Sequence, residues 1–499
     1  MRSVLALLAL ALMALSVWHL ESDRAGLQIG PLAVEGGTPA TLYLREGAGR
    51  APVVVIAHGF AGSRQLMEPF ALTLAQAGYV VASFDFAGHG RNPRPMTGDL
   101  RSVTGTTQVL MDEAGRVARA ALAHPRADGR LAYLGHSMAS DIVVRQAQRE
   151  PLADAVVAVS MFSGSASADA PRNLLIIAGA WETRLAAEAV RAVRQIDPTA
   201  EAGDITGDPA TGPARRAVIA PHVEHVGVLY SATSLQAARD WLDATFGQQS
   251  AGRLPTRGGW IVLLLVATVA LGWPLARALP AGDGAGEGLS TRTFLLAALA
   301  PAVVVPLLLW PFDIRLLPVL VADYLAVHLG LYGLITLALL ARSGGLRAQF
   351  PSRVWWIAGG VALFGIAVVG GVLDRYVASF VPHPGRLAVI AGLALGAVPF
   401  MVGDAVLTGG GRGRLWRVVM ARGAFLASLL TAVALNFEAL FFLVIILPVI
   451  VLFFLLFGMM AGWVGRRTGL PAAAGLGLGL VLAWALGVTF PMFDAGLPG

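Results

Sequence analysis

The sequence predicts an α/β domain with a mostly parallel, eight-stranded sheet and no large lid, followed by an all-α transmembrane domain. The chain has 499 residues, of which only 14% are charged, and its mean hydropathy of +0.68 lies above the range of soluble proteins. Residues 21–257 are mixed in polarity, and short β-branched segments alternate there with amphipathic ones. Residues 258–499 are instead a succession of apolar runs, each close to the length that crosses a membrane.

The composition excludes several kinds of function. The formal net charge is +6, and because the sequence contains no lysine, all 37 basic residues are arginines. Blocks of these arginines lie between apolar runs, where they favour control of membrane topology and contact with lipid headgroups over binding of nucleic acid. The chain has no cysteine, which excludes disulfides, thiolate catalysis and cysteine-based zinc sites.

Residues 1–20 are expected to form a membrane anchor or a signal segment. An apolar run from Val4 to Trp18 follows Met1-Arg2. The lack of a convincing small-x-small cleavage site favours an uncleaved anchor helix, while Ala14-Leu15-Ser16 leaves a cleaved signal peptide as the alternative.

The α/β domain is expected over residues 25–248. A leading hairpin followed by alternating strands and helices predicts parallel pairing with helices on both faces. The strands are expected at 27–34, 39–45, 52–57, 79–84, 130–135, 155–160, 173–178 and 215–220. The helices are expected at 64–77, 103–124, 138–149, 183–195 and 232–246. Only about a dozen residues separate the sixth and seventh strands, so no separate lid domain fits there.

The transmembrane domain is expected over residues 258–499, after a linker at 247–258. Its eight spans are predicted at 259–277, 293–310, 316–341, 354–373, 387–407, 423–437, 439–461 and 470–490. If residues 25–248 lie outside, the cytoplasmic connections carry eleven arginines and the outer ones three. The positive-inside rule therefore predicts a multi-pass protein of a cell (inner) membrane with an extracytoplasmic α/β domain.

A serine lies at a sharp turn between a strand and a helix. The segment Leu134-Gly135-His136-Ser137-Met138-Ala139 follows an apolar strand and precedes a helical pattern. It resembles the nucleophile elbow of the α/β-hydrolase superfamily, whose members include serine esterases and lipases. Ala139 stands where the superfamily more commonly has glycine. The resemblance implies that Ser137 is the nucleophile.

Two further turns resemble the same superfamily. An apolar strand runs into His58-Gly59-Phe60, and the resemblance implies that the backbone N–H groups of Phe60 and Met138 form the oxyanion hole. The segment Asp85-Phe86-Ala87-Gly88-His89-Gly90 resembles a D-x-x-G-x-G turn of lipases and esterases. Because the superfamily places its acid and base after the serine, Asp85, His89 and His58 are expected to be structural.

The resemblance also implies the acid and the base. Glu182 follows the seventh strand, where the superfamily carries an aspartate or glutamate, although a first-turn helix carboxylate is the alternative explanation. His225 lies between the last strand and the last helix, as the superfamily's catalytic histidine does, and fits better than His222, which directly follows a proline. Asp204 and Asp208 are the reserve acids. A metal site at His222 and His225 is disfavoured because two isolated histidines are too few ligands.

A few polar residues lie within the predicted spans, and each is a functional candidate because burying charge in lipid is costly. Asp313, Asp374, Asp404 and Glu438 are explained by nearby span ends or arginines. Asp323 and His328 form the deepest pair, but the sequence shows no charge relay through other helices. We therefore expect these spans to hold the α/β domain at the membrane and to present a lipid-like substrate to it.

The sequence thus predicts a membrane-anchored serine hydrolase that cleaves acyl esters through an acyl-serine intermediate, with a Ser137-Glu182-His225 triad. No cofactor, metal or nucleic acid is expected, and the expected partners are an acyl-ester or lipid-like substrate and membrane lipids. Two alternatives remain: an acyltransferase that uses the same triad, and a transport or sensing protein with a degenerate hydrolase domain. Peptidase activity is a further option, because related folds cleave amides.

Overall fold

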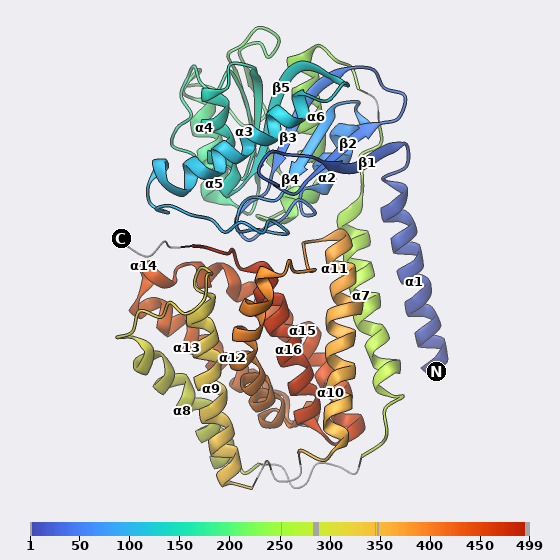
Figure 1. Ribbon diagram of the computed structural model, residues 1–499, viewed down its shortest axis with the longest axis vertical. Coiled ribbons are helices and arrows are strands. Elements are labelled where there is room, and N and C mark those ends of the chain that lie inside the picture. The colour runs from blue at the N-terminus through green and yellow to red at the C-terminus, as the bar shows by residue number, and fades with distance from the viewer. Residues whose placement is uncertain (1, 251, 283–288, 345, 347–348, 495–499) are drawn as a thin grey trace. The chain divides into compact units, whose positions relative to one another are not determined.

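The computed structural model describes residues 2–250, 252–282, 289–344, 346 and 349–494 (Figure 1). These residues fall into two compact units, which are considered separately. The sheet unit comprises Ser16–Val262, Asp374–Ser379 and the segment from Pro491 onward. The helical unit comprises the chain up to Leu15, Leu263–Leu373 and Phe380–Phe490.

The sheet unit contains a nine-stranded sheet in the order β1-β2-β4-β3-β5-β6-β7-β9-β8. Pairing is parallel from β4 through β9 and antiparallel toward both edges. The strands are β1 (Leu27–Leu32), β2 (Ala40–Arg45), β3 (Ala51–Ala57), β4 (Val80–Phe84), β5 (Ala127–His136), β6 (Ala153–Val159), β7 (Asn173–Gly179), β8 (Ile205–Thr206) and β9 (Ala214–Ala220).

The centre of the sheet is covered on both faces. All residues of β3 are buried, as expected for an apolar strand in a parallel sheet. In β5, Ala132 and Leu134 belong to the core that α2 and α6 cover, and the alternation of side chains directs Leu131 and Tyr133 to the opposite face. The helices of this unit are α2 (Glu68–Gln76), α3 (Gln108–Leu122), α4 (Met138–Arg149), α5 (Thr183–Val193) and α6 (Ala232–Phe246), with short turns η1 (Val103–Thr107) and η2 (Gly227–Tyr230).

The observed elements confirm the predicted fold class and differ from it in detail. Strand β8 was not predicted, because two residues are too few to show a periodic pattern. The helix predicted at 64–77 begins only at Glu68, since the preceding residues form successive tight turns. The helix predicted at 103–124 begins with η1, in which Gly105 has non-helical backbone angles. Strand β6 ends at Val159 and β7 begins at Asn173, so the connection is too short for a lid domain.

Two short segments from late in the chain complete the sheet unit. The amide of Ser379 donates to Ser63 Oγ at 3.1 Å, and Arg91 forms an ion pair with Asp374 at 2.5 Å. The amide of Met492 donates to the Gly88 carbonyl, and its own carbonyl accepts from Met96. These contacts hold the connections that follow β3 and β4.

Nine helices among the described residues are long and apolar enough to cross a membrane, which confirms the predicted all-α transmembrane domain. These spans are α1 (Arg2–Ser22), α7 (Arg257–Ala276), α8 (Thr291–Leu309), α9 (Ala322–Arg342), the continuous run of α10 (Arg353–Leu363), η3 (Phe364–Val369) and α11 (Gly370–Tyr376), α12 (Gly385–Leu407), α13 (Leu415–Leu435), α15 (Phe442–Thr468) and α16 (Pro471–Thr489). The short elements η4 (Gly409–Gly411) and α14 (Phe437–Leu440) connect some of them.

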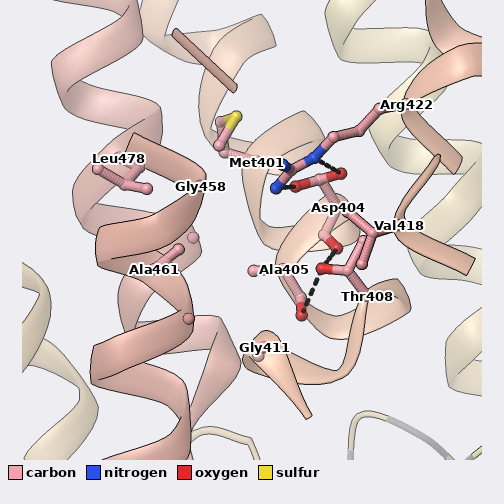
Figure 2. Close-up of a pocket in the computed structure, with 13 residues that line it drawn as sticks. Met401, Asp404, Ala405, Thr408, Gly411, Val418, Arg422, Gly458, Ala461 and Leu478 are labelled. Carbon is pink, nitrogen blue, oxygen red and sulfur yellow. Dashed lines mark hydrogen bonds and ion pairs between the residues drawn. The ribbon is translucent and has the colours of Figure 1, made fainter. Parts of the chain in front are cut away.

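The helix α13 begins earlier in the chain than the sequence predicted. The span predicted at 423–437 begins at Leu415, so Arg417 and Arg422 lie within the helix and not in a connection. Arg422 forms an ion pair with Asp404 of α12 at 3.1 Å (Figure 2). It also donates to the Phe454 carbonyl. A Cβ atom at Gly458 would lie 2.5 Å from the Arg422 guanidinium, so this glycine leaves the space that the arginine occupies.

The Asp404–Arg422 pair lines a cavity of about 60 Å³ between α12, α13, α15 and α16 (Figure 2). Asp323 and His328, which the sequence singled out as a pair, have separate partners. Asp323 is the second residue of α9 and accepts the amides of Leu316 and Tyr324. His328 lies 3.0 Å from the hydroxyl of Ser428 on α13. Asp323 therefore stabilises the start of α9, and His328 stabilises the packing of α9 against α13.

Candidate active site

The predicted nucleophile lies where the topology of the sheet changes direction. The chain passes from β3 to β4 on one side and then to β5 on the other side of β3. The carboxyl ends of β3 and β5 therefore form a switch point, which is where open α/β sheets bind ligands. Ser137 follows β5 and precedes α4, and its φ of 55° is unusual for a residue with a side chain.

Local contacts hold this strained turn. The Ser137 amide donates to the Val159 carbonyl of β6 at 2.9 Å, and Ser140 Oγ donates to the Ser137 carbonyl at 2.5 Å. A Cβ atom at Gly135 would lie 2.6 Å from the Ala139 carbonyl oxygen, so the crossing of strand and helix requires glycine there. Ala139 is fully buried, so the helix tolerates a methyl group at the position where the superfamily more often has glycine.

The structure brings Ser137, His225 and Glu182 together in one hydrogen-bonded chain. His225 Nε2 lies 2.9 Å from Ser137 Oγ, and His225 Nδ1 lies 2.5 Å from Glu182 Oε1. Because a carboxylate only accepts, Nδ1 carries the proton and Nε2 is free to accept one from the serine. His222, the rejected alternative, is exposed and has a φ of 59°.

Three donors fix the Glu182 carboxylate. Its Oε1 accepts from His225, and its Oε2 accepts from Ser160 Oγ at 2.8 Å and from the Gly179 amide at 2.7 Å. Burial alone would raise the pKa of Glu182, but the hydrogen bonds from His225, Gly179 and Ser160 outweigh burial and hold the pKa below its usual value. Glu182 is therefore ionised at neutral pH, and its negative charge stabilises a positive charge on His225.

Ser160 and His136 are two neighbours of the candidate triad that the sequence did not single out. His136 is buried, and its Nε2 donates to the backbone carbonyl of His225 at 2.9 Å. The two imidazole rings lie 4.8 Å apart. Burial, together with the positive charge of a protonated His225, lowers the pKa of His136 to about 3. His136 is thus a neutral anchor for the backbone of His225.

The turn after β3 lies beside the nucleophile. A Cβ atom at Gly59 would lie 3.0 Å from Ser137 Cβ and 3.1 Å from His136 Nδ1, so the backbone of this turn approaches Ser137 closely. Met138 is the first residue of α4, where amides have no partner within the helix. Phe60 and Met138, the predicted oxyanion donors, thus belong to the two turns that flank Ser137.

Asp85, His58 and His89 make contacts that stabilise neighbouring turns. The buried carboxylate of Asp85 accepts the amides of Arg64 and Arg91 and pairs with the Arg64 guanidinium at 2.6 Å. His58 donates from Nδ1 to the Gly59 carbonyl and accepts the Phe86 amide at Nε2. His89 Nδ1 donates to the Ala87 carbonyl. These interactions fix the loops on either side of the turn that contains Phe60.

The reserve acids lie away from this arrangement. Asp204 and Asp208 are both exposed and accept amides from residues within their own surface loop. Within the described residues, no group of three or more histidine, aspartate or glutamate side chains is arranged to hold a metal ion.

Large apolar side chains are exposed on the loops that carry the acid and the base. Trp181 precedes Glu182 and is 67% exposed, and Val226 follows His225 and is 45% exposed. Phe162, two residues after Ser160, is 78% exposed. All three follow the carboxyl ends of β6, β7 or β9, so they lie along the same edge of the sheet as Ser137. We call these three residues the apolar rim.

Comparisons with known proteins match part of the sheet unit, and the matched family segment contains Ser137 and Glu182 but ends before His225. Residues 49–209 match the family model described as serine aminopeptidase, S33. The chain is similar to a dienelactone hydrolase from Anabaena variabilis, with 18% identity, a TM-score of 0.32, and coverage of 44% of this chain and 97% of that one. It is also similar to an esterase from Pyrobaculum calidifontis, with 14% identity, a TM-score of 0.32, and coverage of 48% and 92%. No curated protein matches the chain.

Proposed function

We propose that this α/β hydrolase, carried on a chain of membrane-spanning helices, cleaves acyl esters through an acyl-serine intermediate. The observation that carries the proposal is the continuous hydrogen-bonded chain from Ser137 through His225 to Glu182. Its members come from three separate loops at one edge of the sheet and match the roles of nucleophile, base and orienting acid. A structural role would not require a serine at positive φ.

The proposed reaction has two steps, acylation of Ser137 and hydrolysis of the acyl-serine, and the hydrogen bonds of the candidate triad act in both. Ser137 Oγ attacks the acyl carbon while His225 Nε2 takes its proton, and Glu182 stabilises the resulting imidazolium. The amides of Phe60 and Met138 stabilise the negative charge on the former carbonyl oxygen. The imidazolium then protonates the departing alcohol, which leaves an acyl-serine. Water, activated by His225, releases the acid and restores Ser137.

The apolar rim and the spans support an ester with a lipid-like acyl group. Phe162, Trp181 and Val226 offer apolar surface on loops at the carboxyl edge of the sheet, and no lid domain separates β6 from β7 to cover them. Nine candidate spans keep the hydrolase near a source of such acyl groups. The distribution of arginines favours a position on the extracytoplasmic side of a cell membrane.

The proposal is tested by labelling the full-length protein in membranes with a fluorophosphonate, which reacts with activated serines. We expect labelling of the wild type and of a Ser165→Ala control, but none of Ser137→Ala. A folded wild type that does not react would contradict the proposal and favour a transport or sensing protein with a degenerate hydrolase domain.

A substrate panel then separates the ester hydrolase from its alternatives. We expect p-nitrophenyl esters of long acyl chains to be cleaved faster than an aminoacyl p-nitroanilide, which probes the amide cleavage that the matched family's description suggests. Faster cleavage of the anilide would replace the ester proposal with a peptidase. Transfer of the acyl group to added glycerol, in preference to water, would identify an acyltransferase with the same triad.

A further inference from the structure

A polar pocket lies within the sheet unit, beside the end of α1 and the residues that precede α7. It has a volume of about 230 Å³, and the polar side chains that line it are Ser22, Asp23, Arg45, Gln76 and Arg253. All of these residues lie within Ser16–Val262 and so belong to one compact unit. We call this site the junction pocket. It is separate from Ser137, Glu182 and His225 and has no part in the proposed hydrolysis.

The junction pocket lies beside the ends of two candidate spans, α1 and α7. Ser22 is the last residue of α1, and Arg253 is four residues before the start of α7. The rings of His19 and Trp260, one on each helix, stack with centroids 4.4 Å apart. Trp18 is 67% exposed on α1. Tryptophan side chains favour the interface between hydrocarbon and water, so these rings mark that level beside the pocket.

The pocket carries charges of both signs. Arg45 and Arg253 are exposed, and Arg45 Nη1 donates to the Gln76 carbonyl at 3.3 Å. Guanidinium groups bind phosphate oxygens with paired hydrogen bonds and carry their charge at all physiological pH values. The two arginines therefore form a suitable site for one phosphate group at the membrane surface.

The carboxylate of Asp23 lacks a hydrogen-bond donor. Its side chain is only 9% exposed, and its buried Oδ2 has no hydrogen-bond partner within the described residues. The nearest cation, Arg257 Nη1, is 3.6 Å away. That arginine is already bound to Glu68 at 2.6 Å and to the Leu20 carbonyl at 2.9 Å. Burial raises the pKa of Asp23 above its usual value, and the charge of Arg257 offsets this only in part.

A buried carboxylate without a donor is costly, and a ligand that supplies a charged N–H group would remove that cost. We propose that the junction pocket binds the headgroup of a phospholipid that carries a primary amine. Arg45 and Arg253 take the phosphate, and Asp23 takes the ammonium. A choline headgroup has no N–H to donate, and a glycerol headgroup has no positive charge, so both fit Asp23 less well.

The proposal is tested by native mass spectrometry of delipidated, detergent-solubilised full-length protein. Phosphatidylethanolamine, phosphatidylcholine and phosphatidylglycerol with identical acyl chains are added separately. We expect retention of phosphatidylethanolamine to be at least several-fold greater than that of the other two. Arg253→Ala, alone and with Arg45→Ala, is expected to weaken binding of all three lipids. Asp23→Asn is expected to remove the preference for ethanolamine while phosphate binding persists.

Two controls distinguish loss of lipid binding from unfolding of the protein and from failure of the proposed hydrolase function. Arg315→Ala, which removes another exposed arginine at a span end, is expected to leave lipid retention unchanged. Fluorophosphonate labelling of Ser137 in each variant reports the fold of the sheet unit, and lipid binding is measured whether or not the wild type reacts.

Two results would overturn the proposal. The first is that the wild type retains the three lipids equally, as Asp23→Asn is expected to do. The second is displacement of bound lipid by inorganic phosphate or by water-soluble glycerophosphoethanolamine at the lipid's own concentration, which would identify a soluble phosphate ester as the ligand.

Discussion

At the scale of single residues, the three donors on Glu182 determine how well His225 is oriented. Replacing Glu182 with glutamine keeps the size of the side chain but removes the charge that favours Nδ1 protonation. We expect Glu182→Gln to lower the rate of ester hydrolysis by about 10⁴-fold. Ser160→Ala removes only one of the three donors, and we expect a loss of about tenfold.

Both rates are measured with a soluble p-nitrophenyl ester and the full-length protein in detergent. Ser165→Ala, which lies in the same connection as Ser160, serves as the control and should keep the wild-type rate. If Ser160→Ala also kept that rate, its hydrogen bond to Glu182 would have no role in orienting the base.

His136 makes stability depend on pH. Its folded-state pKa is about 3, whereas an unfolded histidine titrates near 6.5. The unfolded chain therefore binds more protons between these values, and stability falls as the pH is lowered from about 6.5 toward 3. One such group contributes a slope of at most about 1.4 kcal/mol per pH unit. Buried His58, whose pKa is also lowered, acts in the same direction.

We expect His136→Gln to reduce this slope. The measurement is proteolysis of the full-length protein in urea at pH 6.5 and pH 5, a window in which most carboxylates stay ionised. The exposed His222→Gln is the control and should keep the wild-type slope. An unchanged slope in His136→Gln would mean that His136 is protonated in the folded protein.

The resemblance of three motifs to the α/β-hydrolase superfamily was sufficient to place Ser137, Glu182 and His225 in one group. The fold brings them together because the loops of a parallel sheet meet at its carboxyl edge whatever their spacing. Ser160 and His136 could not be found in this way. Their roles depend on which loops come into contact, and neither residue follows a pattern along the chain.

At the scale of elements, the strands and five of the spans were predicted within about three residues at each end. Three spans were displaced further: α9 begins at Ala322 and not at 316, α13 begins at Leu415 and not at 423, and α15 ends at Thr468 and not at 461. The first turns of α13 contain Arg417 and Arg422, which lower the local hydropathy and moved the predicted start to residue 423. Only the fold shows that Asp404 compensates the charge of Arg422. Pairing between helices cannot be detected by a pattern along one helix.

The Asp404–Arg422 pair leads to a prediction about α12 and α13. Removing one partner leaves an uncompensated charge, so Arg422→Met or Asp404→Leu is expected to destabilise the helical unit by about 3–5 kcal/mol. The double variant replaces the pair with apolar groups and is expected to recover most of this loss. Thermal unfolding of the full-length protein in detergent measures each variant.

Arg412→Met, an exposed arginine outside the pair, is the control and should change little. Additive destabilisation in the double variant would show that the two side chains do not depend on each other.

At the scale of the whole molecule, the number of spans is consistent with a sheet unit that lies on one side of the membrane. Four candidate spans lie between α6 and Asp374–Ser379, and four more lie between that segment and Pro491. If each span crosses the membrane, all three parts of the sheet unit emerge on one side. The number of spans does not distinguish the two sides, so only the distribution of arginines favours the extracytoplasmic one.

The absence of cysteine allows a direct test of this orientation. We expect a membrane-impermeant maleimide to label Glu201→Cys in intact cells, because the proposed orientation places the sheet unit outside. Arg412→Cys, between α12 and α13, is expected to react only after permeabilisation. The reverse pattern would place the hydrolase in the cytoplasm, and labelling of the cysteine-free parent would invalidate the assay.

The pairing of Met492 with Gly88 and Met96 has a consequence for biosynthesis. A ribosome makes residues 88 and 96 long before residue 492. The backbone groups of the connection after β4 therefore find these partners only after residue 492 has been made. The nascent sheet unit can form its sheet early, but this loop reaches its final arrangement only after eight further spans have been synthesised.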